Sequence, residues 1–428
     1  MIRIFDNEIE TKDILSREIA AYPEFEGTVK EIIAVVREKG DRALIEYAEK
    51  FDRVSLDSLV VSDDEIKEAF EKVDPALIEV IKTAKENIEE YHRMQLRQGF
   101  RLEKRGGIVL GQKITPIEKA GIYVPGGTAS YPSTVLMNAV PAKIAGVKQT
   151  VMTTPPGRDG KVKPEILAAA SICGVDKIIK CGGAQAIAAL AYGTESVPKV
   201  DKIVGPGNIF VALAKRQVFG VVNIDMIAGP SEILVVADGN AEPAFVAADL
   251  LSQAEHDKLA SAVLVTDSRA LADKVSAELE RQIPLLEREE IARASIDNNG
   301  KIIVVESVER AIEIANLIAP EHLELYLDEP FKYLDSVQNA GSVFLGKYSP
   351  EPLGDYFAGP NHTLPTGGSA RFSSALSVDD FIKKTQYIYY PESELEKVSQ
   401  DIAAFARSEG LGAHAAAVEI RFKKEDEK

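Results

Sequence analysis

The sequence predicts an α/β protein with two Rossmann-like α/β domains, an N-terminal helical segment and a small helical C-terminal tail. Short apolar runs alternate with helical stretches twice along the chain, over about 120–232 and again over about 232–346. This alternation is typical of parallel sheets joined by crossover helices. The chain is also 428 residues long, which is too many for one hydrophobic core.

Residues 1 to about 100 repeat apolar residues at spacings of three and four, so we expect helices there, most clearly over 26–51 and 75–95. In the first alternation the expected strands are 120–124, 149–154, 176–181, 201–204 and 222–228. Most of them end in glycine or proline, in the strings VPGG, CGGAQ, GPGN and GPSE. Ligands of parallel sheets sit beyond the carboxyl ends of the strands, so these turns indicate one ligand-binding edge. The motif GxGxxG is absent, so a nucleotide site there is of a variant kind.

The second alternation predicts strands over 232–238, 261–267, 301–307, 323–327 and 342–346. We expect this unit to pack with the N-terminal helices, which makes the first alternation an insertion. Amphipathic helices are expected at 379–384 and 393–409. They are too small to bury a core alone, which indicates docking on a partner subunit.

The composition excludes several classes of function. A net charge of −17 argues against a nucleic-acid partner and requires an anionic cofactor to be bound by backbone N–H groups and helix N-termini. No apolar run is long enough to cross a membrane, and the charged N-terminus does not resemble a signal peptide, so we expect a cytoplasmic protein. The only cysteines, Cys173 and Cys181, are interpreted as reduced structural thiols.

The histidines are the strongest indication in the sequence of metal binding or acid–base catalysis. His256 follows Gln253 by three residues near the end of a helix, and both are neutral side chains that can bind zinc. A plain interaction of His256 with the helix dipole is the alternative. Glu321 and His322 are adjacent bases suited to acid–base catalysis, with an ordinary surface pair as the alternative.

Three further histidines have distinct surroundings. His362 lies in the irregular segment 354–374, which also contains Asp355, and long irregular segments are often functional. His414, with Glu409 nearby, lies in an apolar helical stretch where a packing histidine is the alternative, and His92 on a charged helix is expected to be solvated. A nitrogen and oxygen zinc set is credible, and its members are Gln253, His256, Asp355 and His414. Only the fold could bring them together.

Eight strings resemble the motifs of the histidinol dehydrogenase family, in order and over nearly the whole chain. They include GIYVPGGTASYPSTVLMNAVPAKIAGV, CGGAQAIAALAYGT, VDKIVGPGNIFVALAKRQVFG, IDMIAGPSEILV, SQAEHD, APEHLEL, GDYFAGPNHTLPTGGSARFSSALSVDDF and EGLGAHAAAV. The resemblance implies one Zn²⁺ per subunit on Gln253, His256, Asp355 and His414, the last from the partner subunit of an interlocked homodimer. It implies substrate contacts from Ser231, Gln253, His256, His322, Asp355, Glu409 and His414. It implies NAD contacts from Tyr123, Gln185 and Asn208, which fall at the glycine-rich strand ends.

The resemblance also implies an activity, the oxidation of L-histidinol to L-histidine through the aldehyde with two NAD. His322 would act as the base in both steps and Glu321 would activate water. The expected domains are 1–21 (helical arm), 22–122 plus 233–375 (metal and catalytic motifs), 123–232 (inserted, NAD-binding) and 376–428 (tail exchanged in the dimer). A zinc hydrolase, a non-catalytic binding protein and a dehydrogenase of another amino alcohol remain alternatives, and manganese or cobalt could replace zinc.

Overall fold

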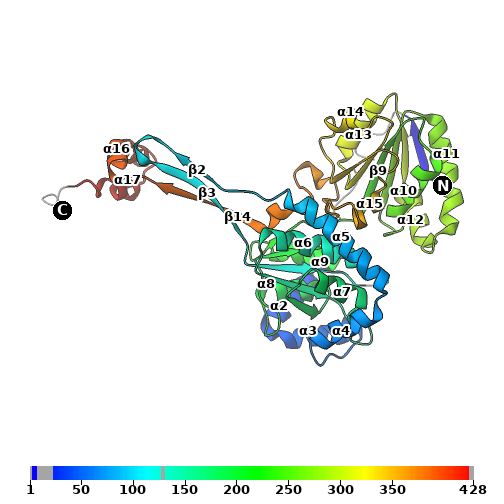
Figure 1. Cartoon of the computed structure of the whole chain (residues 1–428), viewed down its shortest axis with the longest axis horizontal. Coiled ribbons are helices and arrows are strands. Elements are labelled where there is room, and N and C mark those ends of the chain that lie inside the picture. The colour runs from blue at the N-terminus through cyan, green and yellow to red at the C-terminus, as the bar shows by residue number, and fades with distance from the viewer. Residues whose placement is uncertain (1, 7–22, 127–130, 424–428) are drawn as a thin grey trace. The chain divides into compact units, whose positions relative to one another are not determined.

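The structure is a computed structural model that describes residues 2–6, 23–126 and 131–423. It divides into two compact units, Met1–Leu96 with Ile117–Phe381 and Arg97–Pro116 with Ile382–Lys428. Figure 1 draws both units. Among the described residues, no helix has the length and apolar character needed to span a membrane.

The first unit contains a five-stranded parallel sheet with the strand order β6-β5-β4-β7-β8. Its strands are β4 (Lys119–Tyr123), β5 (Gln149–Thr154), β6 (Lys177–Lys180), β7 (Lys202–Val204) and β8 (Asn223–Ile224). Helices α6 (Pro132–Ala145), α7 (Pro164–Ile172), α8 (Gly183–Tyr192) and α9 (Ile209–Val218) connect them. The chain moves outward from β4 to β6 and then returns to β7 on the other side of β4. The predicted alternation is confirmed, and its topological switch point lies between β4 and β7.

The N-terminal helices pack on this five-stranded sheet. They are α2 (Pro23–Lys39), α3 (Asp41–Tyr47), α4 (Asp63–Lys72) and α5 (Pro75–Arg93). Val29 of α2 shares a core with Ile187 of α8, and Ile88 of α5 shares another with Val135 of α6. The expectation that these helices pack with the second α/β unit is therefore wrong. Apolar periodicity shows which face of a helix is buried, but it does not show which sheet that face covers.

A six-stranded parallel sheet, also in the first unit, has the order β1-β11-β10-β9-β12-β13. Its strands are β1 (Arg3–Asp6), β9 (Glu232–Ala237), β10 (Ser261–Thr266), β11 (Lys301–Val304), β12 (His322–Tyr326) and β13 (Ser342–Leu345). The five strands predicted over 232–346 are confirmed. Residues 3–6, expected in a helical arm, instead form the edge strand β1, and residues 7–22 of that arm lie outside the described residues.

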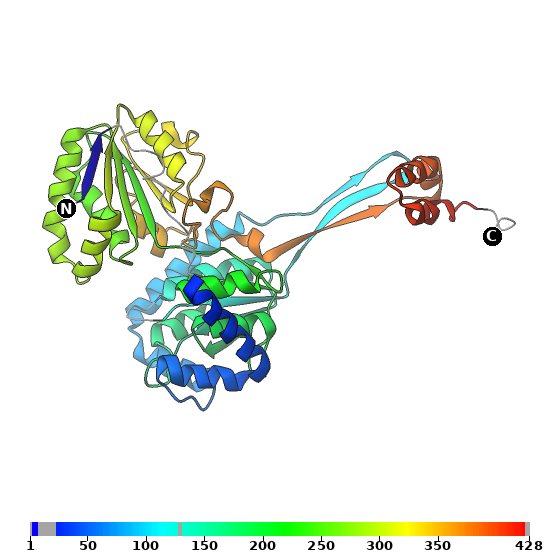
Figure 2. The same ribbon diagram turned by 180° about the vertical axis from the view of Figure 1, so that it is seen from behind.

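Helices cover both faces of the six-stranded sheet (Figure 2). One face packs against α10 (Pro243–Ala254), α11 (Arg269–Gln282) and α12 (Glu289–Asn299), and the other against α13 (Val308–Ile318). A short helix, α14 (Phe331–Leu334), precedes β13. The chain runs from β9 outward to β11 and later returns to β12 on the other side of β9. A second topological switch point therefore lies between β9 and β12.

The second unit is an antiparallel sheet with two helices. Strand β3 (Val109–Pro116) lies between β2 (Phe100–Glu103) and β14 (Ile382–Tyr389), and α16 (Glu392–Ser408) and α17 (Gly412–Glu419) follow. Helix 393–409 is confirmed as α16. The helix expected over 379–384 is wrong, because a 3₁₀ turn, Val378–Phe381, leads directly into β14. The three strands of this sheet were not predicted, since most of their side chains are exposed and carry little apolar alternation.

The two cysteines are buried within the first unit, as expected of structural thiols. Cys173 lies in the core between α5, α6 and the sheet, and Cys181 lies in the core on the opposite face. Both are free thiols. Burial raises the pKa of Cys173 to about 12, and it also raises the pKa of Cys181.

Candidate active site

The candidate site lies at the amino ends of β9, β12 and β13. His322 is the first residue of β12, where it pairs with Ile233 of β9 and Ser342 of β13, and Glu321 directly precedes it. The two side chains are buried, with 4% of His322 and 8% of Glu321 exposed. The alternative of a surface pair is therefore wrong. Two buried ionisable groups side by side indicate a functional site.

The hydrogen bonds of His322 fix which ring nitrogen is free. Its Nδ1 lies 2.9 Å from the backbone oxygen of Glu232, which can only accept, so Nδ1 carries the proton. Its Nε2 has no hydrogen-bond partner among the described residues and lies 3.7 Å from Oε1 of Glu351 and 4.0 Å from Oδ1 of Asp355. Burial lowers the pKa of His322 to about 4. The neutral ring therefore presents a free lone pair at Nε2.

Glu321 is bound by the neighbouring strand. Its Oε2 accepts a hydrogen bond of 2.9 Å from the backbone N–H of Glu232 and lies 3.7 Å from Nδ1 of His322. Burial raises the pKa of Glu321 well above its ordinary value, and the nearby Glu232 carboxylate raises it further. Burial thus raises the pKa of Glu321 and lowers the pKa of His322. The two adjacent bases therefore differ in their affinity for a proton.

Helix α15 (Glu351–Tyr356) adds two carboxyl groups one turn apart, the buried Glu351 and the half-buried Asp355. Burial raises the pKa of both. The neighbouring Asp355 carboxylate further raises the pKa of Glu351, so Glu351 is the more readily protonated of the two groups. Such crowding of acidic groups without a counter-charge is costly unless a cation binds there.

Several side chains here could bind a metal ion. The ligand atoms of His322, Glu351 and Asp355 all lie within 4.8 Å of one another. The amide oxygen of Gln253, Nε2 of His322 and Oε1 of Glu351 are buried, and the described residues offer them no hydrogen-bond partner. A bound cation satisfies orphaned atoms of this kind, so the donor set fits a metal ion.

Two of the expected metal ligands, Gln253 and His256, lie near these residues. Gln253 lies in the last turn of α10, and its amide lowers the pKa of Glu351. His256 follows the end of α10 and is exposed as a residue, but partial desolvation of its ring and the nearby Arg288 and His362 lower its pKa. The position of His256 beyond the helix end, near a second imidazole, favours a site over a dipole contact.

The remaining predicted substrate contacts are placed as follows. Ser231 directly precedes β9, and its backbone oxygen accepts a hydrogen bond of 3.0 Å from the N–H of Ser261. Glu409, which ends α16, and His414 of α17 belong to the second unit, where both side chains are exposed. A packing role for His414 within its own chain is therefore wrong.

Sequence reasoning missed Glu351 and misjudged His92. Glu351 lies four residues before Asp355, so helical spacing in the segment EPLGDY could have indicated it. His92 is fully buried, not solvated. Its Nδ1 lies 2.8 Å from the backbone oxygen of Ile88, and its Nε2 lies 3.4 Å from Nδ2 of Asn361. His92 thereby supports the irregular segment that carries His362, whose Nδ1 lies 3.1 Å from the backbone oxygen of Asp355.

The predicted cofactor contacts lie at the carboxyl edge of the five-stranded sheet. Tyr123 ends β4, Gln185 lies in the first turn of α8 after β6, and Asn208 caps α9 after β7. The Tyr123 hydroxyl accepts a hydrogen bond of 3.0 Å from the N–H of Gly183, and burial raises the pKa of Tyr123 to about 12. All three residues therefore lie at the edge of the first switch point.

A buried ion pair supports the GPGN turn at this edge. Lys215 of α9 and Asp225, which follows β8, form an ion pair with 3% and 1% of their side chains exposed. The Lys215 ammonium donates to the backbone oxygen of Gly205 at 2.9 Å, and Asp225 accepts from the Gly205 N–H at 2.8 Å. Gly205 has φ +113°, and a Cβ there would lie 2.1 Å from the backbone oxygen of Tyr123, so only glycine fits.

Known proteins of one family match this chain over nearly its whole length. The family model described as histidinol dehydrogenase matches residues 15–422. The histidinol dehydrogenase of Clostridium acetobutylicum is 60% identical over 92% of both chains, and that of Streptococcus mutans is 58% identical over 92% of both. The crystal structure of histidinol dehydrogenase from Elizabethkingia anophelis is 40% identical, covers 98% of both chains and superimposes with a TM-score of 0.94.

Proposed function

Because the chain belongs to the histidinol dehydrogenase family, we propose that it oxidises L-histidinol to L-histidine in two NAD-dependent steps. The observation that supports this most directly is the buried, neutral His322, whose free Nε2 lies beside two carboxyl groups. A buried base with an available lone pair is what removal of an alcohol proton requires.

The proposed metal ligands are Gln253, His256, Asp355 and the partner subunit's His414. A zinc ion bound there would supply positive charge that orients the amine and imidazole of histidinol. Only Asp355 is common to this set and to the convergent group of His322, Glu351 and Asp355. We keep His322 as the base because its Nδ1 hydrogen bond fixes Nε2 as an acceptor. The orphaned amide oxygen of Gln253 supports its place among the ligands.

The two bases divide the proton transfers. His322 takes the hydroxyl proton of the alcohol in the first oxidation and of the hydrated aldehyde in the second. Glu321, bound to the backbone of β9 beside His322, takes a proton from the water that hydrates the aldehyde. Burial raises the pKa of Glu321, which makes its carboxylate a stronger base than an exposed carboxylate.

NAD would bind at the carboxyl edge of the five-stranded sheet, contacted by Tyr123, Gln185 and Asn208, and would accept the hydride. Helices α8 and α9 begin at this edge, and the positive ends of their dipoles suit the phosphates of a dinucleotide. The phosphates need such helix N-termini because the chain carries a net charge of −17 and lacks a basic tract that could bind them.

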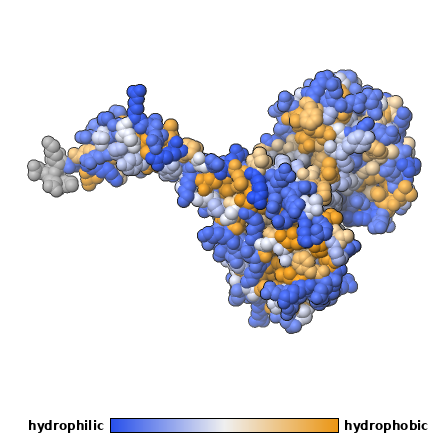
Figure 3. All heavy atoms as spheres, viewed as in Figure 1, coloured by the Kyte–Doolittle hydropathy of each residue, from blue (hydrophilic) through white to orange (hydrophobic). Residues whose placement is uncertain are grey.

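We further propose that the chain acts as a cytoplasmic homodimer with shared sites. The second unit exposes several large apolar side chains, including Phe100, Leu102, Ile388, Tyr389 and Phe405 (Figure 3). A small unit with such a surface is better suited to an interface than to solvent. Glu409 and His414 would then reach the substrate and metal of the partner subunit.

The test is NADH formation by the purified protein with NAD and L-histidinol, before and after chelation and zinc restoration. Two NADH per histidinol, lost on chelation and regained with zinc, are expected. One NADH would contradict the second oxidation. No NADH with zinc bound would favour another amino alcohol or a zinc hydrolase.

A further inference from the structure

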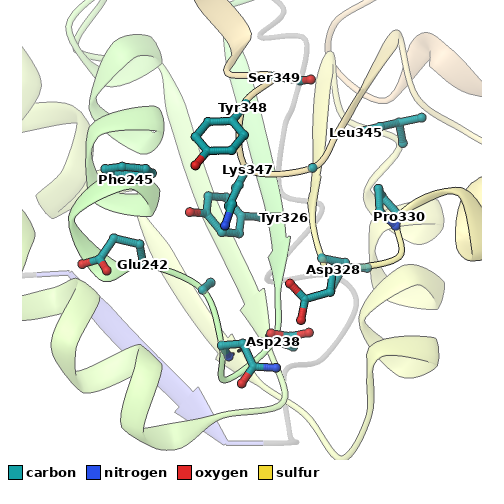
Figure 4. A pocket seen from close by; sticks show the side chains of 14 residues that line it. Asp238, Glu242, Phe245, Tyr326, Asp328, Pro330, Leu345, Lys347, Tyr348 and Ser349 are labelled. Atoms are coloured by element: carbon teal, nitrogen blue, oxygen red, sulfur yellow. Dashed lines mark hydrogen bonds between the residues drawn. The ribbon is translucent and has the colours of Figure 1, made fainter.

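A pocket of about 470 Å³ lies at the carboxyl ends of β9, β12 and β13 (Figure 4). This is the second topological switch point, where parallel sheets usually bind ligands, and the volume is within the range of small-molecule sites. His322 begins strand β12 and Tyr326 ends it, so the pocket and the candidate active site lie at opposite ends of the same strands. The proposed reaction therefore does not use this pocket.

Three acidic side chains and one lysine line the pocket, and the lysine forms no ion pair with the acidic groups. Asp238 follows β9, Glu242 precedes α10, and Asp328 and Lys347 follow β12 and β13. Within the described part of the chain, Lys347 forms no ion pair, and its ammonium lies only near the ring of Tyr348, at 5.2 Å from the centroid. The three carboxylates also do not belong to a group that converges closely enough for a metal ion, as far as the described residues show.

Tyr326 adds a buried hydroxyl with no acceptor. It is 6% exposed and lines the pocket, and its hydroxyl oxygen lies near the backbone N–H of Glu242 but the hydroxyl has no hydrogen-bond acceptor among the described residues. Figure 4 shows Tyr326 and Lys347 among the side chains that line the pocket. A buried hydroxyl without an acceptor is costly, so the site offers two donors, one phenolic and one cationic, for an anionic group.

Two large rings stand at the side of these polar groups. Phe245 of α10 is 47% exposed, and Tyr348 is 77% exposed. Both belong to the pocket lining. Exposed rings beside polar groups are typical of sites that bind a flat organic group by stacking.

We propose that this pocket binds a free α-amino acid with a flat side chain, as its zwitterion. Tyr326 and Lys347 donate hydrogen bonds to the carboxylate of the ligand, and Asp328 and Glu242 accept hydrogen bonds from its ammonium. The side chain of the ligand lies against Phe245 and Tyr348. A nucleotide is disfavoured because three carboxylates would repel its phosphates, and a simple amine would leave the two donors unused.

The ligand test uses the full-length protein and isothermal titration calorimetry with L-phenylalanine, which lacks the imidazole of the proposed substrate. Phenethylamine lacks the carboxylate and 3-phenylpropionate lacks the ammonium. We expect each to bind at least about tenfold more weakly than phenylalanine, the size of one lost charge-assisted hydrogen bond. Equal binding of phenethylamine, or no binding of phenylalanine, would overturn the proposal.

The location is tested by Asp328→Asn, Lys347→Met and Tyr326→Phe. Each is expected to weaken phenylalanine binding by about tenfold. The matched controls Asp335→Asn and Lys332→Met change exposed residues of the same types outside the pocket lining and are expected to bind as the wild type does. NAD-linked histidinol oxidation, retained in all five variants, verifies folding. Wild-type phenylalanine affinity in all three pocket variants would overturn the assignment.

Discussion

Lys215 and Asp225 form a buried ion pair that holds both backbone hydrogen-bonding groups of Gly205. The turn that carries Asn208 is thereby fixed at the switch point of the five-stranded sheet. The pair touches neither of the proposed catalytic bases, so we predict that it positions the proposed cofactor edge.

Lys215→Met is expected to raise the KM for NAD several-fold more than it changes kcat, because the turn loses one of its two supports. It should also destabilise the protein by about 3–5 kcal/mol, since Asp225 is left buried and unpaired. The measurements are steady-state kinetics and denaturant unfolding. The double variant Lys215→Met/Asp225→Leu should recover stability but not the KM. A normal KM in the single variant would contradict the positioning role.

His322→Asn is expected to slow both half-reactions by about 10²–10⁴-fold, because the free Nε2 is lost. Glu321→Gln should slow mainly the oxidation of the aldehyde. Stopped-flow NADH formation from histidinol and from histidinaldehyde separates the two steps. Full-rate aldehyde oxidation by Glu321→Gln would rule out our role for that residue.

Metal content distinguishes the two candidate ligand groups. Gln253→Ala and Asp355→Asn are expected to lower zinc content, whereas Glu351→Gln should retain it, because Glu351 is not among the proposed ligands and its raised pKa favours the neutral carboxyl group. Zinc per subunit, measured by atomic absorption after dialysis, is the readout. Loss of zinc in Glu351→Gln with retention in Gln253→Ala would favour the convergent group of His322, Glu351 and Asp355.

Shared sites predict complementation between inactive variants. His414→Asn should lower zinc content, and mixing it with His322→Asn should restore about a quarter to a half of wild-type activity in mixed dimers, since one of two sites is intact. Subunit exchange is verified by mass spectrometry before assay. Verified mixed dimers without activity would count against a partner-supplied His414.

His92 predicts a specific loss of stability in acid. Burial lowers the pKa of His92 below its ordinary value of 6.5, so the unfolded chain binds its proton more readily than the folded chain. Stability from this residue is present at neutral pH and falls as the pH drops below about 6.5, by at most about 1.4 kcal/mol per pH unit. His92→Gln should lose less stability than the wild type between pH 7.5 and 5.5 in urea unfolding. Equal losses would show that His92 does not titrate with folding.

Much of the fold follows from apolar patterning, because the inner strands are buried on both faces. Strands such as β9 and β10 read as continuous apolar runs and were located correctly. Strand β2 is exposed at all four positions, so the pattern carried no signal for it. Local patterns also did not show which sheet the N-terminal helices cover.

Only the parts of the candidate site that are close together in the sequence could be predicted. Gln253 and His256 share a local spacing, and Glu321 and His322 are adjacent, so sequence alone could pair them. Their approach to Asp355 depends on the register of β9 and β12 and on the return of α15 to the sheet. The burial that shifts the pKa of His322 to about 4 is likewise a property of the folded core.

Because both cysteines are buried, neither is expected to react with thiol reagents added to the folded protein. A thiol with a pKa of about 12 stays protonated at neutral pH, and the thiolate is the reactive form. A single cysteine introduced on the surface, for example in α16, would therefore take up a fluorophore or spin label without background from Cys173 or Cys181. Distances between labelled subunits can therefore be measured without first replacing the native cysteines.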